Sequence, residues 1–288
     1  MEIGRFNHLK VIKKTAFGIF LESDAGDILV PAKHVPEGTE PGDMLDVFVY
    51  TDSEDRIIAT TQVPKALAGE FAFLRVKEVT PHGAFLDWGL DKDLLVPFSE
   101  QHTKMERGRN YLVKLFVHEE TGRVTGSTKT EKFIEHENIT LRGGEEVSIL
   151  IIGLTGIGIR VIVNDRYFGL LYKNEVFQKL NIGDRVKGYV KRAREDGKID
   201  VMLTKGGAES IEEAREAILQ KLKESPKKFL PMGDSTSPEV IREILHMSKK
   251  AFKRAVGGLY KDELIELTTE GIRLKRVDKR KIVHKFKF

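Results

Sequence analysis

The chain of 288 residues contains one pattern of glycines three times. In each copy a middle glycine follows the first by fourteen residues, and a last glycine follows the middle one by 24 or 25 residues. The three sets are Gly4, Gly18 and Gly42, then Gly69, Gly83 and Gly108, then Gly144, Gly158 and Gly183. The first two copies also share the string G-x-F-x-x-L-x-V. A repeat at fixed spacing constrains the architecture, so we expect three similar units in succession.

Each copy contains short runs of β-branched and aromatic residues that end in polar turns, for example residues 47–50, 112–117 and 186–190. Such runs are typical of strands, and the turns S-E-D-R, E-T-G-R and E-D-G-K suit hairpins. About five strands in roughly 62 residues predict a small closed barrel. A unit of that size buries only about 60% of its unfolded surface, so the copies are expected to pack on one another or on the fourth unit.

The apolar period changes to about 3.6 residues from Ala208 onward, which predicts an amphipathic helix. Ser237 and Ser248 are predicted to cap two further helices, and the last of these is expected to stop at the glycines 257–258. A hairpin with Gly271 in its turn follows. The predicted apolar stripe of the second helix consists of Val240, Ile241, Ile244 and Leu245. Three helices and a hairpin in this order predict a winged helix.

Copy two contains residue strings that resemble a known family. They are G-A-F-L at 83–86, L-V-P-F-S-E at 95–100, G-x-x-Y-x-V-K-L at 108–115 and the E-T-G-R turn. These strings resemble the ribosomal S1-type repeat, a five-stranded OB-fold that binds single-stranded RNA. Three such repeats and then a winged helix resemble the CvfB family, the conserved virulence factor B proteins. The resemblance implies RNA binding and regulation of gene expression, with no catalytic activity.

We therefore expect a multidomain, mainly β protein of three S1-type OB-fold barrels in tandem and a C-terminal α+β winged-helix domain with a basic tail. The predicted domain boundaries are 1–63, 64–142, 143–207 and 208–288.

The resemblance also implies candidate RNA-binding residues. In S1-type repeats the RNA face contains one aromatic residue before the middle glycine, one two residues after it, a His on the third strand, and an Asp and Arg at the last hairpin. Copy one offers Phe17, Phe20, Asp52 and Arg56, with Pro31 at the His position. Copy two offers His82, Phe85 and Arg123, with Pro97 at the His position and Glu119 at the Asp position. Copy three offers Arg160, Tyr172, Arg194 and Lys198, with Ile157 at the first aromatic position.

Aromatic rings and cations in this arrangement suit a single strand, because the rings stack on bases and the cations neutralise phosphates. Alternation along a strand places Phe20 and Phe85 opposite their following leucines. We expect both rings outside, with burial in the core as the alternative. Trp88 is assigned to the core. Stacking and core roles both remain open for the pair at 167–168, whereas stacking is favoured for Tyr172.

Charge is distributed unevenly along the chain. Residues 1–142 carry 18 basic and 23 acidic side chains, a net charge of −5; residues 143–205 carry 11 and 8 (+3), and residues 206–288 carry 19 and 13 (+6). In winged helices the third helix commonly enters a DNA major groove. The candidate phosphate contacts there are Lys249, Lys250, Lys253, Arg254, Arg273 and Lys275. The alternatives are a solvated face or a protein-binding face, and the tail 275–288 is either a phosphate-attracting arm or a disordered end.

No motif predicts an active site. The chain has no Cys, its eight His lack metal-binding spacing, and G-L-T-G-I-G at 153–158 lacks the helix that binds a dinucleotide. We expect no enzyme activity, cofactor or metal. We also expect no membrane span and no secretory signal, which makes the cytoplasm the expected location. Single-stranded RNA is the leading partner. The alternatives are a duplex DNA-binding transcription regulator acting through the winged helix and a protein-interaction scaffold.

Overall fold

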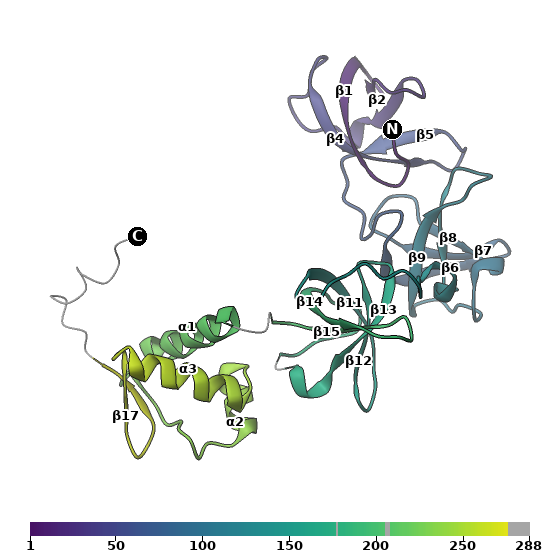
Figure 1. The fold of residues 1–288 in the computed structure, drawn as a ribbon. Coiled ribbons are helices and arrows are strands. Elements are labelled where there is room, and N and C mark those ends of the chain that lie inside the picture. Colours follow the sequence, from purple (N-terminus) through teal and green to yellow (C-terminus); the bar gives the residue numbers. More distant parts are fainter. Residues whose placement is uncertain (177, 205–207, 276–288) are drawn as a thin grey trace. The chain divides into compact units, whose positions relative to one another are not determined.

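The computed structural model describes residues 1–176, 178–204 and 208–275, and it contains three closed barrels and a helix–sheet domain (Figure 1). This architecture confirms the predicted fold class. Contacts divide the chain into two compact units, Met1–His136 with Ile162–Tyr167, and Glu137–Val161 with Phe168–Phe288. The four domain boundaries stay predictions, and the basic tail from residue 276 lies outside the described residues.

Barrel one closes in the strand order β1-β2-β3-β5-β4. Its strands are β1 (Phe6–Thr15), β2 (Gly18–Leu21), β3 (Ile28–Pro31), β4 (Met44–Thr51) and β5 (Ile57–Thr60). Every pair is antiparallel except β3 with β5, which is parallel and closes the ring. The side chains of Val11, Leu21 and Val30 have no exposed surface, because alternate residues of each strand face the barrel interior.

Barrel two repeats this arrangement in the strand order β10-β8-β7-β6-β9. Its strands are β6 (Phe71–Thr80), β7 (Gly83–Asp87), β8 (Leu94–Pro97), β9 (Asn110–Val117) and β10 (Val124–Ser127). The parallel closure again joins the third and fifth strands, with Thr125 opposite Leu95. Equivalent strands in barrels one and two therefore have equivalent partners, as the repeat predicts.

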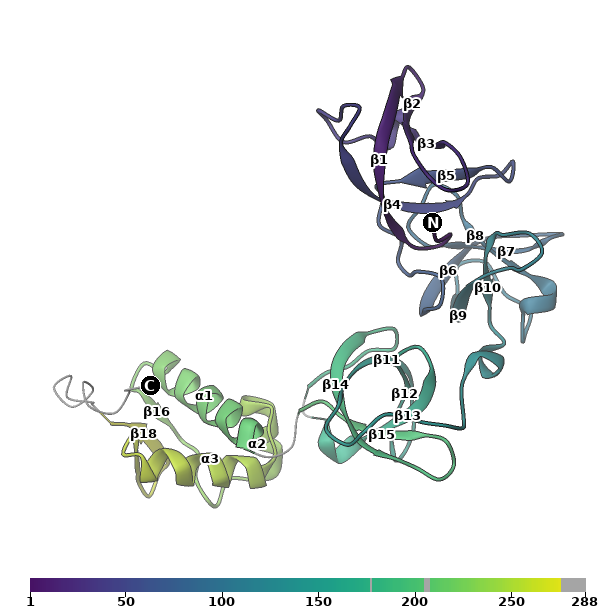
Figure 2. The same cartoon turned by 45° about the horizontal axis from the view of Figure 1, so that its top comes forward.

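Barrel three closes in the order β11-β12-β13-β15-β14. Its strands are β11 (Glu146–Leu154), β12 (Gly158–Val163), β13 (Tyr167–Tyr172), β14 (Arg185–Ala193) and β15 (Ile199–Met202). Figure 2 looks into this barrel, where the strands form a ring. A short 3-10 helix follows the third strand of every barrel: η1 (Ala32–His34), η2 (Phe98–Glu100) and η4 (Lys173–Glu175). A fourth, η3 (Thr130–Phe133), follows barrel two. Tyr167 and Phe168 are buried in barrel three. Of the two roles left open for this pair, stacking and core packing, the structure therefore favours core packing.

The middle glycine of the repeat lies where the neighbouring strand leaves no room for a side chain. Gly18 has a φ of +144°, and a Cβ there would lie 2.0 Å from the carbonyl oxygen of Val30. Gly83 has a φ of +143°, and its Cβ would lie 2.3 Å from the oxygen of Val96. Side chains do not tolerate either condition, so the fold itself requires these glycines.

Barrels one and two share a hydrophobic core. Phe48 and Tyr50 of β4 pack with Trp88, which follows β7, in one cluster of buried side chains. The ring centroid of Trp88 lies 5.7 Å from that of Phe48 and 6.2 Å from that of Tyr50, both edge to face. Such aromatic pairs add about 0.5 to 1.5 kcal/mol beyond their burial. The predicted core position of Trp88 is confirmed, and so is the expectation that neighbouring copies pack together.

The C-terminal domain is a winged helix. Its helices are α1 (Ala208–Glu224), α2 (Pro238–Leu245) and α3 (Lys249–Lys261), and its sheet has the order β16 (Phe229–Leu230), β18 (Ile272–Leu274) and β17 (Ile265–Leu267). The Oγ of Ser237 accepts a hydrogen bond from the backbone N–H of Val240 at 3.4 Å, and the Oγ of Ser248 from that of Ala251 at 3.1 Å. Both predicted helix caps are confirmed.

Two details of this domain were predicted wrongly. Helix α3 does not stop at the glycines 257–258 but continues to Lys261, because Leu259 is fully buried and keeps the next turn packed on the core. In α2 the predicted apolar stripe is only half right, since Ile241 and Leu245 are buried while the other two members are exposed. Those exposed members are Val240 (39%) and Ile244 (36%). The two buried residues are spaced i, i+4 and therefore lie on one face of the helix.

Candidate nucleic-acid interface

Barrel one presents its two predicted stacking rings on the outside. Phe17 lies in the turn between β1 and β2 and is 80% exposed. Phe20 is half-buried on β2, between the buried Ile19 and Leu21. The Nζ of Lys13, from the paired strand, lies 6.0 Å from the centre of the Phe20 ring. The outward position that alternation predicts for Phe20 is therefore observed, and a cation lies beside it.

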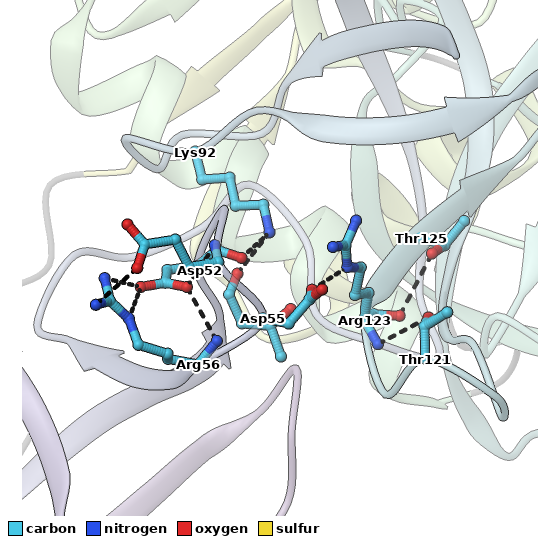
Figure 3. A network of polar contacts seen from close by, with 9 residues as sticks. Asp52, Asp55, Arg56, Lys92, Thr121, Arg123 and Thr125 are labelled. Carbon is cyan, nitrogen blue, oxygen red and sulfur yellow. Dashed lines mark hydrogen bonds and ion pairs between the residues drawn. The ribbon is translucent and has the colours of Figure 1, made fainter.

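The other two candidates of barrel one, Asp52 and Arg56, bind each other across the β4–β5 turn (Figure 3). The carboxylate of Asp52 accepts hydrogen bonds from the Arg56 Nε at 2.8 Å and from the backbone N–H groups of Glu54 and Arg56 at 2.8 and 3.0 Å. Partial burial raises the pKa of Asp52, but these bonds outweigh it and lower the pKa overall. Asp52 thus holds the turn, while the Arg56 side chain remains 66% exposed.

The three candidates of barrel two line one groove of about 350 Å³. Phe85 is half-buried, His82 is exposed, and Arg123 lies at the end of the β9–β10 turn. Barrel one contributes the opposite part of the same groove, with Tyr50, Thr51 and Ser53. The groove is therefore formed by the RNA face expected of copy two and by the last hairpin of copy one.

A polar network joins the two barrels beside this groove (Figure 3). The Nε of Arg123 donates a hydrogen bond to Asp55, which lowers the pKa of Asp55 and raises that of Arg123. The Nζ of Lys92 donates to the carbonyl oxygens of Thr51 at 2.8 Å and Asp52 at 2.7 Å, and burial lowers the pKa of Lys92. The repeat alone could not reveal Asp55 or Lys92, because each acts on the neighbouring copy.

Barrel three combines one ring with many cations. Tyr172 is half-buried, and the Nζ of Lys191 lies 5.1 Å from its ring centre. Arg160 is exposed, with its guanidinium 5.9 Å from the ring of Phe168. The predicted pair Arg194 and Lys198 shares the carboxylate of Asp196, at 3.1 and 3.2 Å.

The same barrel contains a buried carboxylate that the sequence analysis missed. Asp200 on β15 has no exposed surface, and its Oδ2 accepts a hydrogen bond from the Nε of Arg192 at 2.7 Å. The hydroxyl of Tyr172 lies 3.4 Å from the same oxygen. The sequence signal for this pair was an aspartate inside the apolar run I-D-V-M at 199–202. A carboxylate buried in such a run generally requires a cationic partner.

The cations of the winged helix differ in their surroundings. Lys250 and Arg254 of α3 are exposed, Lys249 is half-buried, and Lys253 binds Asp234 at 3.0 Å. In the wing, the guanidinium of Arg273 lies 5.5 Å from the ring of Phe229, and Lys275 is half-buried. The structure brings His82, Phe85 and Arg123 of barrel two together in one groove and pairs Asp52 with Arg56 in barrel one. The contact of the candidates with nucleic acid stays a prediction.

Over residues 1–176, 178–204 and 208–275, no group of three or more His, Asp or Glu side chains has an arrangement that would hold a metal ion. Within the same ranges no helix has the length and apolar character needed to cross a bilayer.

Comparison with known proteins identifies both ends of the chain. Residues 3–62 match the S1 domain, and residues 216–274 match the CvfB-like winged helix domain. Conserved virulence factor B of Staphylococcus epidermidis (strain ATCC 12228) is 26% identical over 242 residues, which cover 82% of this chain and 81% of that protein. The chain is a relative of conserved virulence factor B. This finding confirms the resemblance stated from the sequence.

Two further proteins match this CvfB-like chain over most of its length. The uncharacterized protein YitL of Bacillus subtilis is 29% identical over 273 residues, covering 91% of this chain and 90% of YitL. A crystal structure of a multidomain protein with nucleic acid binding domains from Streptococcus pneumoniae is 22% identical, with a TM-score of 0.39 and coverage of 95% of this chain and 98% of that one. The S1 domain match supports nucleic-acid binding by the present chain.

Proposed function

We propose that this CvfB-like protein binds single-stranded RNA without catalysing a reaction, and that it regulates gene expression in the cytoplasm after transcription. One observation carries the proposal: rings that the repeat predicts for stacking lie at the barrel surfaces. Phe17 is exposed, and Phe20, Phe85 and Tyr172 are half-buried. Rings placed only for core packing would be fully covered, as the ring of Tyr167 is.

Cations beside these rings support the same function. Lys13 lies near Phe20, and Lys191 lies over Tyr172. A base that stacks on an aromatic ring gains about 1 to 3 kcal/mol, and a neighbouring cation binds the phosphate that follows the base. This combination suits unpaired strands, because the base faces of a duplex are already stacked on each other.

The proposal is tested by titrating the full chain against three labelled nucleic acids of equal length: single-stranded RNA, the matching single-stranded DNA and duplex DNA. Fluorescence anisotropy at several salt concentrations gives the affinities. We expect both single strands to bind more tightly than the duplex, with RNA tightest and with affinity that falls as salt rises. Equal or tighter binding to the duplex contradicts the proposal. The absence of salt-sensitive binding to all three would instead favour a protein-interaction scaffold.

A second candidate function is duplex DNA binding through the winged helix. The exposed Lys250 and Arg254 on α3 favour it, because this helix is the one that enters the major groove in such domains. The variant Lys250→Glu with Arg254→Glu would then weaken duplex binding and reduce its salt dependence. The matched control is Lys221→Glu with Lys223→Glu, which reverses two exposed charges on α1 of the same domain. Equal effects of both variants would indicate a nonspecific charge effect.

A further inference from the structure

The groove between barrels one and two has walls from both barrels. Barrel two supplies Phe85 and Leu95 among others, barrel one supplies Thr51 and Ser53, and the rings of Tyr50 and Trp88 also line the groove. Its volume of about 350 Å³ lies at the lower end of the range of roughly 300 to 1,000 Å³ typical of small-ligand pockets. Space of this size suits one flat ring system better than a run of nucleotides.

The two walls are held together by contacts that do not involve a ligand. Tyr50 and Trp88 pack edge to face within the core that the barrels share. Arg123 binds Asp55 of the β4–β5 hairpin. Lys92 donates hydrogen bonds to the carbonyl oxygens of Thr51, the last residue of β4, and of Asp52. The groove is therefore formed in advance, which reduces the entropy lost on binding.

The chemistry of the walls indicates what fits. Aromatic and aliphatic surfaces predominate, while the hydroxyl-bearing Thr51, Ser53 and Thr125 also line the groove. Its two long cations already have protein partners, Asp55 for Arg123 and backbone carbonyls for Lys92. A phosphate would have to displace those partners, whereas an uncharged ring would not. The walls thus favour a flat ring with polar edges over an anion.

We propose that this groove binds one nucleobase of a single-stranded nucleic acid, and that the site exists only where both barrels contribute. The inference rests on the proposed function and adds a location and a ligand group to it. A base enters such a groove only when it is unstacked, so the site selects unpaired strands. The affinity of barrel two for the base then depends in part on the hairpin of barrel one.

Trp88 reports on this site, since it is the single tryptophan of the chain and lines the groove. The experiment titrates the full chain with unlabelled hexa-adenylate and hexa-uridylate RNA and records tryptophan fluorescence. A parallel titration with end-labelled RNA records anisotropy, which detects binding anywhere on the protein. We expect Trp88 fluorescence to change with the same midpoint as the anisotropy.

Two variants test the two walls. Phe85→Ala removes the half-buried ring that barrel two contributes to the groove. It is expected to weaken the binding reported by Trp88 fluorescence by about 5- to 150-fold, as for loss of one base stack. Asp55→Ala frees the hairpin of barrel one from Arg123. This variant is also expected to weaken the RNA binding that Trp88 fluorescence reports. Glu54→Ala is the matched control, because Glu54 is in the same turn but pairs with Arg56 of its own hairpin. Circular dichroism establishes that each variant is folded.

The outcomes separate this inference from the proposed function. If anisotropy reports binding but Trp88 fluorescence does not change, the groove is not the base site and the proposed function survives. If Phe85→Ala weakens binding while Asp55→Ala matches Glu54→Ala, barrel two binds the base alone and the composite site is wrong. If anisotropy reports no RNA binding at any salt concentration, the proposed function itself fails. Should Phe85→Ala not fold, the comparison of Asp55→Ala with Glu54→Ala decides the composite site.

Discussion

The Nε of Arg192 lies 2.7 Å from the Oδ2 of Asp200, and the two side chains are 67% and 0% exposed. A fully buried carboxylate thus anchors a guanidinium at the surface of barrel three. A second guanidinium, that of Arg194, lies 3.8 Å from the other carboxylate oxygen. Asp200 therefore pairs with Arg192 and with the candidate Arg194, and is itself inaccessible to a ligand.

We expect Arg192→Met to lower the free energy of unfolding by about 1 to 3 kcal/mol, because Asp200 loses its closest donor and stays buried. Urea denaturation followed by circular dichroism measures the change. Lys198→Met is the control, since Lys198 pairs with the exposed Asp196 and should change stability by less than about 0.5 kcal/mol. If the two variants have the same urea midpoint, Arg192 does not stabilise Asp200.

The double variant Phe17→Ala with Phe20→Ala is expected to weaken single-stranded RNA binding by about 1 to 3 kcal/mol at moderate salt. Both rings lie on the outer side of barrel one, so their loss should leave the core intact. Anisotropy titration gives the affinity. Met44→Ala removes an exposed apolar side chain without a ring from the same barrel and should bind RNA like the parent. An unchanged affinity in the folded double variant would exclude these rings from the site.

Gly83→Ala should destabilise the compact unit that contains barrels one and two by at least about 2 kcal/mol. The added Cβ would approach the Val96 carbonyl oxygen to 2.3 Å at a φ of +143°, and strain and overpacking each cost about 1 to 3 kcal/mol. Thermal denaturation measures the effect. Gly153→Ala is the matched control, because a Cβ there would meet no heavy atom within 4 Å. Equal melting temperatures for the two variants would show that close strand approach does not explain the repeated glycine.

Tyr50 is expected to make the compact unit that contains barrels one and two sensitive to alkali. Burial raises the pKa of its hydroxyl to about 12, with smaller contributions from the carboxylates of Asp91 and Asp52. A folded-state pKa above the unfolded value of about 10 means that the stabilisation is complete below pH 10 and is lost as the pH rises toward 12.

Absorbance at 295 nm, recorded against pH, should show one tyrosine titrating near pH 12 in the folded chain. Tyr50→Phe should remove that step. The control is Tyr260→Phe, which changes a ring that is 54% exposed and should leave the step in place. A step that persists in Tyr50→Phe would assign it to another residue.

The sequence alone determined the local and repeated features of this protein. The spacing of the middle glycines predicted three similar barrels. That spacing is a reliable signal because a neighbouring carbonyl oxygen leaves no room for a side chain at Gly18 or Gly83. Ser237 and Ser248 predicted the starts of two helices, since a cap is a contact within three residues. The alternation of strand residues placed Phe20 outside, because facing depends on a period of two.

Only the tertiary structure decided which surfaces meet. Asp55 binds Arg123, 68 residues later, and Tyr50 packs on Trp88 in a different barrel. Such contacts leave no periodic signal, because they depend on how two complete barrels pack. The same holds for the buried Asp200 and for the exposed Ile244, whose surroundings come from other elements of their domains. Periodicity and spacing fixed each unit, whereas packing between folded surfaces created the groove and its ion pairs.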